Sequence, residues 1–96
     1  MKHVYLVSYD IADDKRWRRI FKVLKGYGDS VQLSVFVCVL TPEQKVGLLS
    51  DTLSIINQDQ DKLLIADLGP QNGRGGDRLQ TFGQKMFLGA SGPIII

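Results

Sequence analysis

The chain has 96 residues, of which 44% are hydrophobic and 23% charged, so it is the size of one small globular domain and has no room for two. Its net charge of +2 is too small for a general nucleic-acid coat, so any basic binding surface has to be local. One cysteine and one histidine exclude an internal disulfide and a His/Cys metal cluster. The apolar N-terminal stretch is too short for a signal peptide or a membrane span, so we expect a cytoplasmic protein without membrane contact.

The first two predicted elements are a strand over residues 4–9 and a helix that follows Asp13. The strand is rich in β-branched and aromatic residues on both faces, which is typical of a covered central strand. Asp13 has the residue type of an N-cap, and the apolar residues of the helix recur at helical spacing at Trp17, Ile20, Phe21 and Leu24. The sequence Lys-Gly-Tyr-Gly at 25–28 predicts where this helix ends.

Residues 30–40 alternate in polarity, which predicts one long strand or a bulged pair of strands. The aliphatic face, with Val31, Leu33, Val35, Val37 and Val39, is the expected core face. The mixed face, which contains Ser34 and Phe36, is expected to form a surface for a partner.

Thr41, Pro42 and Gln44 predict the start of a second helix, with a capping box and proline at its first position. Its expected core stripe consists of Val46, Leu49, Leu53 and Ile56. A further buried strand is expected at 62–68, a mobile glycine-rich loop at 69–77 and a last strand at 79–88.

The order of these elements predicts an α+β fold of the ferredoxin-like plan (βαββαβ), with two helices on one face of the sheet and a C-terminal tail strand. The domain is expected to comprise residues 1–68. Residues 69–96 are expected to form a glycine-rich loop and a tail that packs on its own subunit or on a partner. One sheet face stays uncovered by helices, and a second copy of the chain is the expected occupant, so we expect a homodimer.

Half of the twelve basic residues lie within the eleven positions 15–25, which contain no acidic residue. On a helix these residues form a cationic outer face, whereas Trp17, Phe21 and Leu24 point inward. A solvated face is the ordinary interpretation of such a pattern. The absence of compensating acids favours contact with phosphates instead, and the candidate nucleic-acid-binding residues are Lys15, Arg16, Arg18, Arg19 and Lys22.

Asp10 ends the first predicted strand and is the candidate catalytic and metal-binding residue. Chemistry on a phosphodiester without histidine or a reactive cysteine needs a divalent ion, and Mg²⁺ takes oxygen ligands, often from one or two carboxylates. A lone aspartate at this position is otherwise a strand terminator. If two copies pair across a two-fold axis, Asp10 and its copy supply the carboxylate pair that one chain lacks.

The remaining candidates have supporting roles. Ser34 and Phe36 lie on one strand face and are assigned either to the positioning of a phosphate or ribose or to an interface, and Tyr9 is a packing aromatic beside Asp10. Cys38 lies in mid-strand between apolar residues, which predicts a buried structural thiol. Arg74 and Arg78 are minor candidates for phosphate contact.

Four motifs in order resemble the CRISPR-associated Cas-two family: Val-Ser-Tyr-Asp at 7–10, Asp-Asp-Lys-Arg-x-Arg-Arg at 13–19, Gly-Tyr-Gly at 26–28 and Gln-x-Ser-Val-Phe-x-Cys at 32–38. The resemblance is slight beyond residue 69. It implies a ferredoxin-like homodimer in which Asp10 binds a catalytic divalent metal near the two-fold axis. It also implies a metal-dependent endonuclease on RNA or DNA that bridges copies of the Cas-one integrase during spacer acquisition.

The sequence departs from the family pattern at Ser30, where a basic residue is common, and at Val37, where an acidic residue is common. These departures weigh against efficient cleavage more than against a scaffold role. The leading hypothesis is nevertheless a dimeric, Mg²⁺-dependent phosphodiesterase that acts on duplex DNA, single-stranded RNA or both. The alternatives are a non-catalytic duplex-DNA-binding scaffold and a toxin-type ribonuclease on the same fold.

Overall fold

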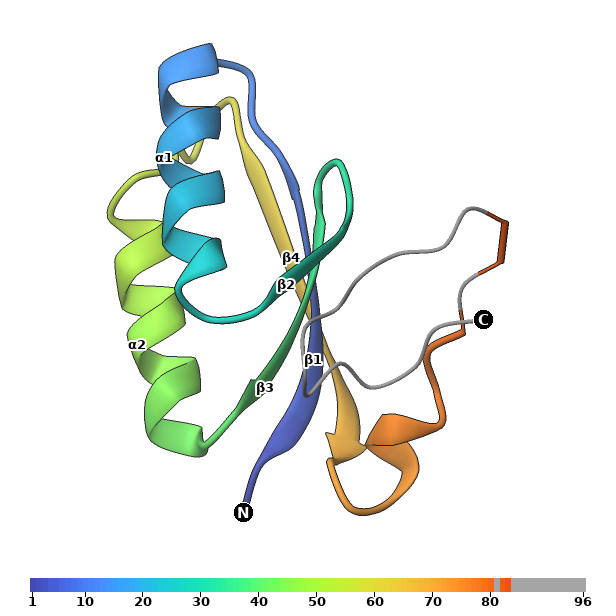
Figure 1. The fold of residues 1–96 in the computed structure, drawn as a ribbon. Helices are drawn as coiled ribbons and strands as arrows, with labels where there is room; N and C mark the ends of the chain where they lie inside the picture. The colour runs from blue at the N-terminus through green and yellow to red at the C-terminus, as the bar shows by residue number, and fades with distance from the viewer. Residues whose placement is uncertain (81, 84–96) are drawn as a thin grey trace.

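A computed structural model describes residues 1–80 and 82–83 of the chain. Its elements are β1 (His3–Asp10), α1 (Asp14–Lys25), β2 (Asp29–Gln32), β3 (Val35–Leu40), α2 (Pro42–Leu53), β4 (Lys62–Pro70) and a short 3₁₀ turn, η1 (Arg74–Gly76). The strands form one antiparallel sheet in the order β2-β3-β1-β4, and both α-helices cover the same face (Figure 1). The predicted ferredoxin-like α+β fold is confirmed. The expected last strand at 79–88 and the packing of the tail lie mostly outside the described residues.

Both predicted helix starts are confirmed. The Asp13 side chain accepts a hydrogen bond from Arg16 N (3.0 Å), which caps α1. Thr41 and Gln44 form the expected reciprocal capping box at the start of α2.

After α1 the chain crosses close to β3 at Gly28, where an added Cβ would lie 2.3 Å from the Val37 carbonyl oxygen. Glycine is therefore required for the chain to return to the sheet.

The main core lies between the helices and the sheet, and it corrects the predicted faces of β3. Phe36, Cys38 and Leu40 point toward the helices and are buried with Ile20 and Leu24 of α1. Phe36 is fully buried, with its ring 5.4 Å from that of Phe21 in an edge-on arrangement. The expectation that Phe36 forms a partner surface is wrong, because the large aromatic ring fills the deeper space that the helix layer provides.

The valines of the hairpin lie on the opposite, helix-free face of the sheet. Val4, Val31 and Val37 are buried there, with partly buried Leu6, Val35, Val39, Leu68 and Leu79 packed against them. The long predicted strand is divided by a turn at Leu33 and Ser34, and Leu33 is 77% exposed. Leu33 is therefore not a core residue, because the turn interrupts the alternation that assigned it to the core.

The predicted core stripe of α2 is wrong at two of its four positions. Val46 is 67% exposed and Leu53 46% exposed, whereas Leu48 and Thr52 are fully buried. Leu49 and Ile56 pack against the core as expected. Thr52 is tolerated in the core because its hydroxyl donates to the Leu48 carbonyl oxygen (2.8 Å), which satisfies the polar group within the helix.

β4 is an edge strand and contains no fully buried residue, so the prediction of a buried strand is also corrected. The strand continues to Pro70, two residues beyond the predicted domain boundary. In the glycine-rich segment, η1 packs against the end of β4, where an added Cβ on Gly75 would lie 2.3 Å from the Gly69 carbonyl oxygen.

Candidate functional site

Asp10 is the last residue of β1, and it lies exposed at one end of the sheet. Side chains alternate along a strand, so Asp10 shares the helix-free face with Val4, Leu6 and Ser8. Within residues 1–80 and 82–83 no side chain or backbone group forms a hydrogen bond or an ion pair with its carboxylate. Lys62, the first residue of β4, lies opposite Asp10 in the register of the two strands. The carboxylate is therefore available to a ligand.

The β2–β3 turn lies beside the same end of β1. Tyr9 N donates to the Ser34 carbonyl oxygen (3.1 Å), and the Tyr9 hydroxyl donates to the Leu33 carbonyl oxygen (3.3 Å). Tyr9 is buried, and burial raises its pKa above the ordinary value for tyrosine. The structure thus brings Ser34 close to the Asp10 end of the sheet. Tyr9 holds the turn in place, in keeping with a packing role.

Four aromatic rings support this end of the molecule from the helix side. Trp17 and Phe21 of α1 are stacked at 5.4 Å, and Tyr9 lies 6.3 Å from Trp17 and 6.2 Å from Phe36. Aromatic pairs at these separations contribute packing energy beyond the apolar area that they bury. The cluster packs α1 against the helix side of the sheet, at the end of β1 that carries Asp10.

The outer side of α1 is cationic, as predicted. Its side chains Lys15, Arg18, Arg19, Lys22 and Lys25 are exposed. None of the five forms an ion pair within the part of the chain that the structure describes. A hollow of about 420 Å³ is lined by Arg19, Lys22 and Val23 of α1 and by Ile55, which follows α2. Its two cations and two aliphatic side chains suit a ligand that carries both a phosphate and an apolar group.

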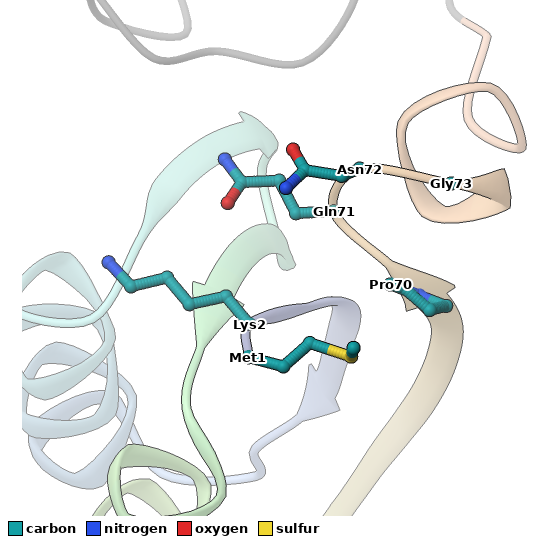
Figure 2. A pocket seen from close by; sticks show the side chains of 6 residues that line it. All are labelled: Met1, Lys2, Pro70, Gln71, Asn72 and Gly73. Atoms are coloured by element: carbon teal, nitrogen blue, oxygen red, sulfur yellow. The ribbon is translucent and has the colours of Figure 1, made fainter.

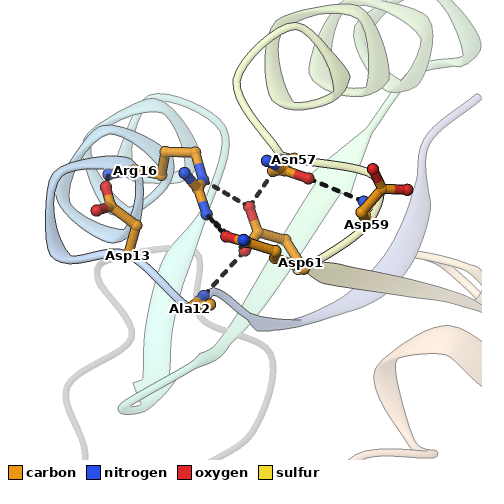
Figure 3. A network of polar contacts seen from close by, with 7 residues as sticks. Ala12, Asp13, Arg16, Asn57, Asp59 and Asp61 are labelled. Carbon is orange, nitrogen blue, oxygen red and sulfur yellow. Dashed lines mark hydrogen bonds and ion pairs between the residues drawn. The ribbon is translucent and has the colours of Figure 1, made fainter.

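Arg16 differs from the other α1 cations because it is already paired. Its Nε donates to Asp61 Oδ2 (2.8 Å) and its Nη2 donates to Asp61 Oδ1 (3.2 Å) and to Gln60 Oε1 (3.1 Å). Figure 3 shows this network at the start of α1. Binding of nucleic acid by Arg16 stays a prediction, and the guanidinium already pairs with Asp61 and Gln60 in the folded chain. Asp61 is not among the residues predicted from the sequence, because its partner lies 45 positions away in the chain.

The residues at the Asp10 end fit a divalent cation only in part. Within the described residues no group of three or more His, Cys, Asp or Glu side chains is placed to hold a metal ion. Mg²⁺ nevertheless binds through one or two carboxylates, with water and substrate phosphates as its other ligands. The Asp10 carboxylate, exposed and with no partner among the described residues, supplies one such ligand.

Cys38 is excluded as a nucleophile. It is fully buried in mid-strand, and burial, together with the charge of Asp29, raises the pKa of its thiol to about 12. A thiol with this pKa contains almost no thiolate at neutral pH. The predicted structural role of Cys38 is confirmed.

The second hollow of the molecule lies at the opposite end of the sheet from Asp10. It measures about 500 Å³ and is lined by Met1, Lys2, Pro70, Gln71, Asn72 and Gly73 (Figure 2). Gln71 N donates to the Lys2 carbonyl oxygen (2.9 Å), which joins the two segments that form it. Its lining contains the charged side chain of Lys2 but no acidic side chain, so it offers no carboxylate as a general acid or base.

A sequence model of the family described as "CRISPR associated protein Cas2" matches residues 2–73, which is most of the described chain. The chain belongs to this family. The resemblance to the Cas-two (Cas2) family that the four motifs indicated is thereby confirmed, and the matched segment includes Asp10, α1 and Asp61.

Curated Cas2 relatives support this assignment. A protein of Rhodospirillum rubrum named "CRISPR-associated endoribonuclease Cas2 1" is 51% identical over 69 residues, covering 72% of this chain and 68% of its own. A Geobacter sulfurreducens protein named "CRISPR-associated endoribonuclease Cas2" is 46% identical over 70 residues, covering 73% and 74%.

The fold is similar to solved Cas2 structures. The crystal structure of Streptococcus pyogenes Cas2 at pH 6.5 matches with a TM-score of 0.72 and 32% identity, covering 83% of this chain and 99% of that one. A hypothetical protein of Thermus thermophilus, TT1823, matches with a TM-score of 0.70 and 29% identity over the full length of both chains. Neither helix of this Cas2-family chain is long and apolar enough to cross a bilayer, and the described residues contain no other candidate span.

Proposed function

We propose that this Cas2-family chain is a metal-dependent nuclease that hydrolyses phosphodiester bonds, with Asp10 as the metal ligand and α1 as the phosphate-binding element. The observation that supports this most directly is the exposed carboxylate of Asp10, which has no partner among the described residues. It lies four residues before α1, whose cations other than Arg16 form no ion pair with the described residues. A strand-terminating aspartate with only a structural role is expected to accept a hydrogen bond from its neighbours.

Asp10 would hold the ion, and a bound divalent cation would supply activated water and neutralise charge on the phosphate. Lys15 of the first turn and Arg18, Arg19 and Lys22 further along α1 would bind and orient the substrate phosphates. Ser34, whose backbone carbonyl oxygen accepts from Tyr9 N, would donate a hydrogen bond from its hydroxyl to a phosphate or ribose oxygen near Asp10. The two relatives described above are named endoribonucleases, so single-stranded RNA is the first substrate to test.

We propose further that the active unit is a homodimer formed through the helix-free face. Leu6 of β1 and Val35 and Val39 of β3 are only partly buried on this face, and Leu64 of β4 is 58% exposed on the same side. Because Asp10 lies on this face too, a two-fold pairing would bring a second carboxylate toward the first. The dimer would thus complete the donor set that a single chain supplies in part.

The test compares wild type with Asp10→Asn on labelled single-stranded RNA and duplex DNA, each with Mg²⁺ and with chelator. We expect cleavage only with Mg²⁺ and a loss of about 100-fold or more in Asp10→Asn, because a metal site contributes several kcal/mol to the transition state. Asp14→Asn, which also removes an exposed carboxylate nearby, is the matched control and is expected to retain activity. Cleavage that persists in Asp10→Asn would refute Asp10 as the metal ligand.

A non-catalytic DNA-binding scaffold that bridges the Cas-one integrase is the second candidate function. It is favoured by the absence, among the described residues, of any group of three or more His, Cys, Asp or Glu side chains that could hold a metal ion. In this case wild type binds duplex DNA and Cas-one without cutting nucleic acid. Replacing Arg19 and Lys22 together by alanine should weaken binding to any sequence and reduce the slope of log K against log salt by about 2. Lys2→Ala with Lys45→Ala removes the same charge from positions outside α1 and should leave the slope unchanged.

A further inference from the structure

The buried carboxylate of Asp61 joins three segments of the chain beside Asp10 (Figure 3). Its Oδ1 accepts from Ala12 N (2.9 Å) in the β1–α1 connection, and its Oδ2 accepts from Asn57 N (2.7 Å) in the α2–β4 connection. Both oxygens also accept from the guanidinium of Arg16 in the first turn of α1. One side chain thus fixes two loops and a helix to one another.

The burial and charge of Asp61 and Arg16 suit a pair that holds neighbouring segments in a fixed position. The Asp61 side chain is fully buried, and that of Arg16 is only 22% exposed. Hydrogen bonds from Arg16, and then from the Asn57 and Ala12 N–H groups, hold the pKa of the Asp61 carboxyl well below its ordinary value. The group is therefore a permanent acceptor for four N–H donors. A planar guanidinium paired with both carboxylate oxygens also fixes the relative orientation of the two groups.

The network constrains Asp10 from both sides. Ala12, which Asp61 holds, is two residues beyond Asp10 in the chain. Lys62, which directly follows Asp61, is the residue opposite Asp10 in the β1–β4 register. The Asp10 side chain itself forms no hydrogen bond with the described residues, so its direction depends on the backbone that carries it.

We infer that Asp61 and Arg16 act together as a positioning pair for Asp10, and that this is the role of Arg16 in place of phosphate binding. The inference rests on the proposed function of Asp10. Removal of the pair would leave the sheet and helices in place, because the apolar core lies elsewhere. It would release the β1–α1 connection and widen the range of directions that the Asp10 carboxylate can take.

The experiment uses Asp61→Asn and Arg16→Lys in the full chain, with Asp67→Asn as the matched control. Asp67 of β4 contacts His3 of β1 (2.9 Å) at the other end of these two strands. Its substitution therefore also removes a carboxylate contact between distant parts of the chain but leaves the Asp10 end unchanged. Two properties are measured: amide hydrogen exchange of Ile11 and Ala12 by NMR, and binding of Mn²⁺ alone by calorimetry. Cleavage of the proposed substrate is a third readout.

We expect Asp61→Asn to speed exchange at Ile11 and Ala12 by about 10-fold or more and to weaken Mn²⁺ binding by about 10–100-fold, the range found for groups that orient a metal ligand. Arg16→Lys keeps the charge but loses the two-point contact, so it should lie between wild type and Asp61→Asn in both properties. Asp67→Asn should match wild type in both.

A folded Asp61→Asn with wild-type exchange at Ile11 and Ala12, or with faster exchange but wild-type Mn²⁺ affinity, would overturn the inference and leave Asp61 a purely structural residue. If Asp61→Asn does not fold, Arg16→Lys decides by the same two measurements. Mn²⁺ binding by Asp10→Asn separates the proposed metal site from the proposed positioning pair. Undiminished Mn²⁺ binding by this variant refutes the metal site at Asp10. The hydrogen-exchange measurement alone then decides whether Asp61 and Arg16 fix the backbone at Asp10.

Discussion

The charge on Asp61 ties the stability of this small fold to acid pH. In the folded chain the pKa of Asp61 lies well below its usual range, because Arg16 and two backbone N–H groups donate to the carboxylate. In the unfolded chain the pKa returns to about 3.9. Below about pH 5 the unfolded state therefore binds more protons than the folded state. The stabilisation from the Asp61 carboxylate is complete above about pH 5 and is lost progressively as the pH falls below this value.

We therefore predict that the unfolding free energy of Asp61→Asn decreases less than that of wild type as the pH is lowered. Urea unfolding at pH 7 and at pH 3 should show a smaller loss of unfolding free energy in Asp61→Asn than in wild type. The control is Asp59→Asn, since the Asp59 carboxylate accepts no hydrogen bond from the described residues. An equal loss in wild type and Asp61→Asn would show that the ion pair does not contribute to acid sensitivity.

At the scale of elements, each α-helix begins at a cap that local sequence specifies. In α2 the Thr41 hydroxyl accepts from Gln44 N (3.2 Å), and the Gln44 side-chain oxygen accepts from Thr41 N (2.9 Å). These two bonds satisfy backbone donors that have no partner inside the helix. Because α2 buries only Leu48 and Thr52 completely, the cap is a substantial part of what holds this helix in place.

We predict that Thr41→Ala lowers the unfolding free energy by about 1 kcal/mol, the usual cost of losing such a cap. Ser50→Ala is the matched control, because Ser50 is an exposed hydroxyl residue within the same helix and its hydroxyl has no hydrogen bond to the described residues. Urea unfolding measures both. Equal effects of the two substitutions would show that the capping box does not stabilise α2.

At the scale of the whole molecule, the proposed homodimer depends on the helix-free face. Leu64 lies on this face, because its neighbours Leu63 and Ile65 pack on the helix side. It is 58% exposed, so a charge at this position leaves the fold of one chain intact and opposes the burial of the face against a second copy.

We predict that wild type sediments at twice its chain mass of 10.7 kDa and that Leu64→Asp sediments as a monomer. Val46→Asp is the control, since Val46 is an aliphatic residue of similar exposure (67%) on α2, on the other side of the sheet. It should remain a dimer. A wild-type monomer, or a Leu64→Asp dimer of unchanged affinity, would contradict pairing through this face.

The sequence by itself determined the features that depend on neighbours in the chain. The cap at Asp13, the capping box at Thr41, the cationic outer side of α1 and the order of elements all follow from spacings of a few residues, and the family motifs lie within this local pattern. The same spacing identified Asp10 as the end of β1 and therefore as the candidate site residue.

Only the tertiary structure decided which of two equivalent faces packs inward and which charges are paired. Alternation separates Phe36 from Val37, but it does not say which of them meets the helices, and the ring of Phe21 decides this. Likewise, Arg16 resembles its cationic neighbours in sequence, yet Asp61 reaches it from 45 positions away. Such pairings depend on the three-dimensional path of the chain, so local spacing carries no record of them.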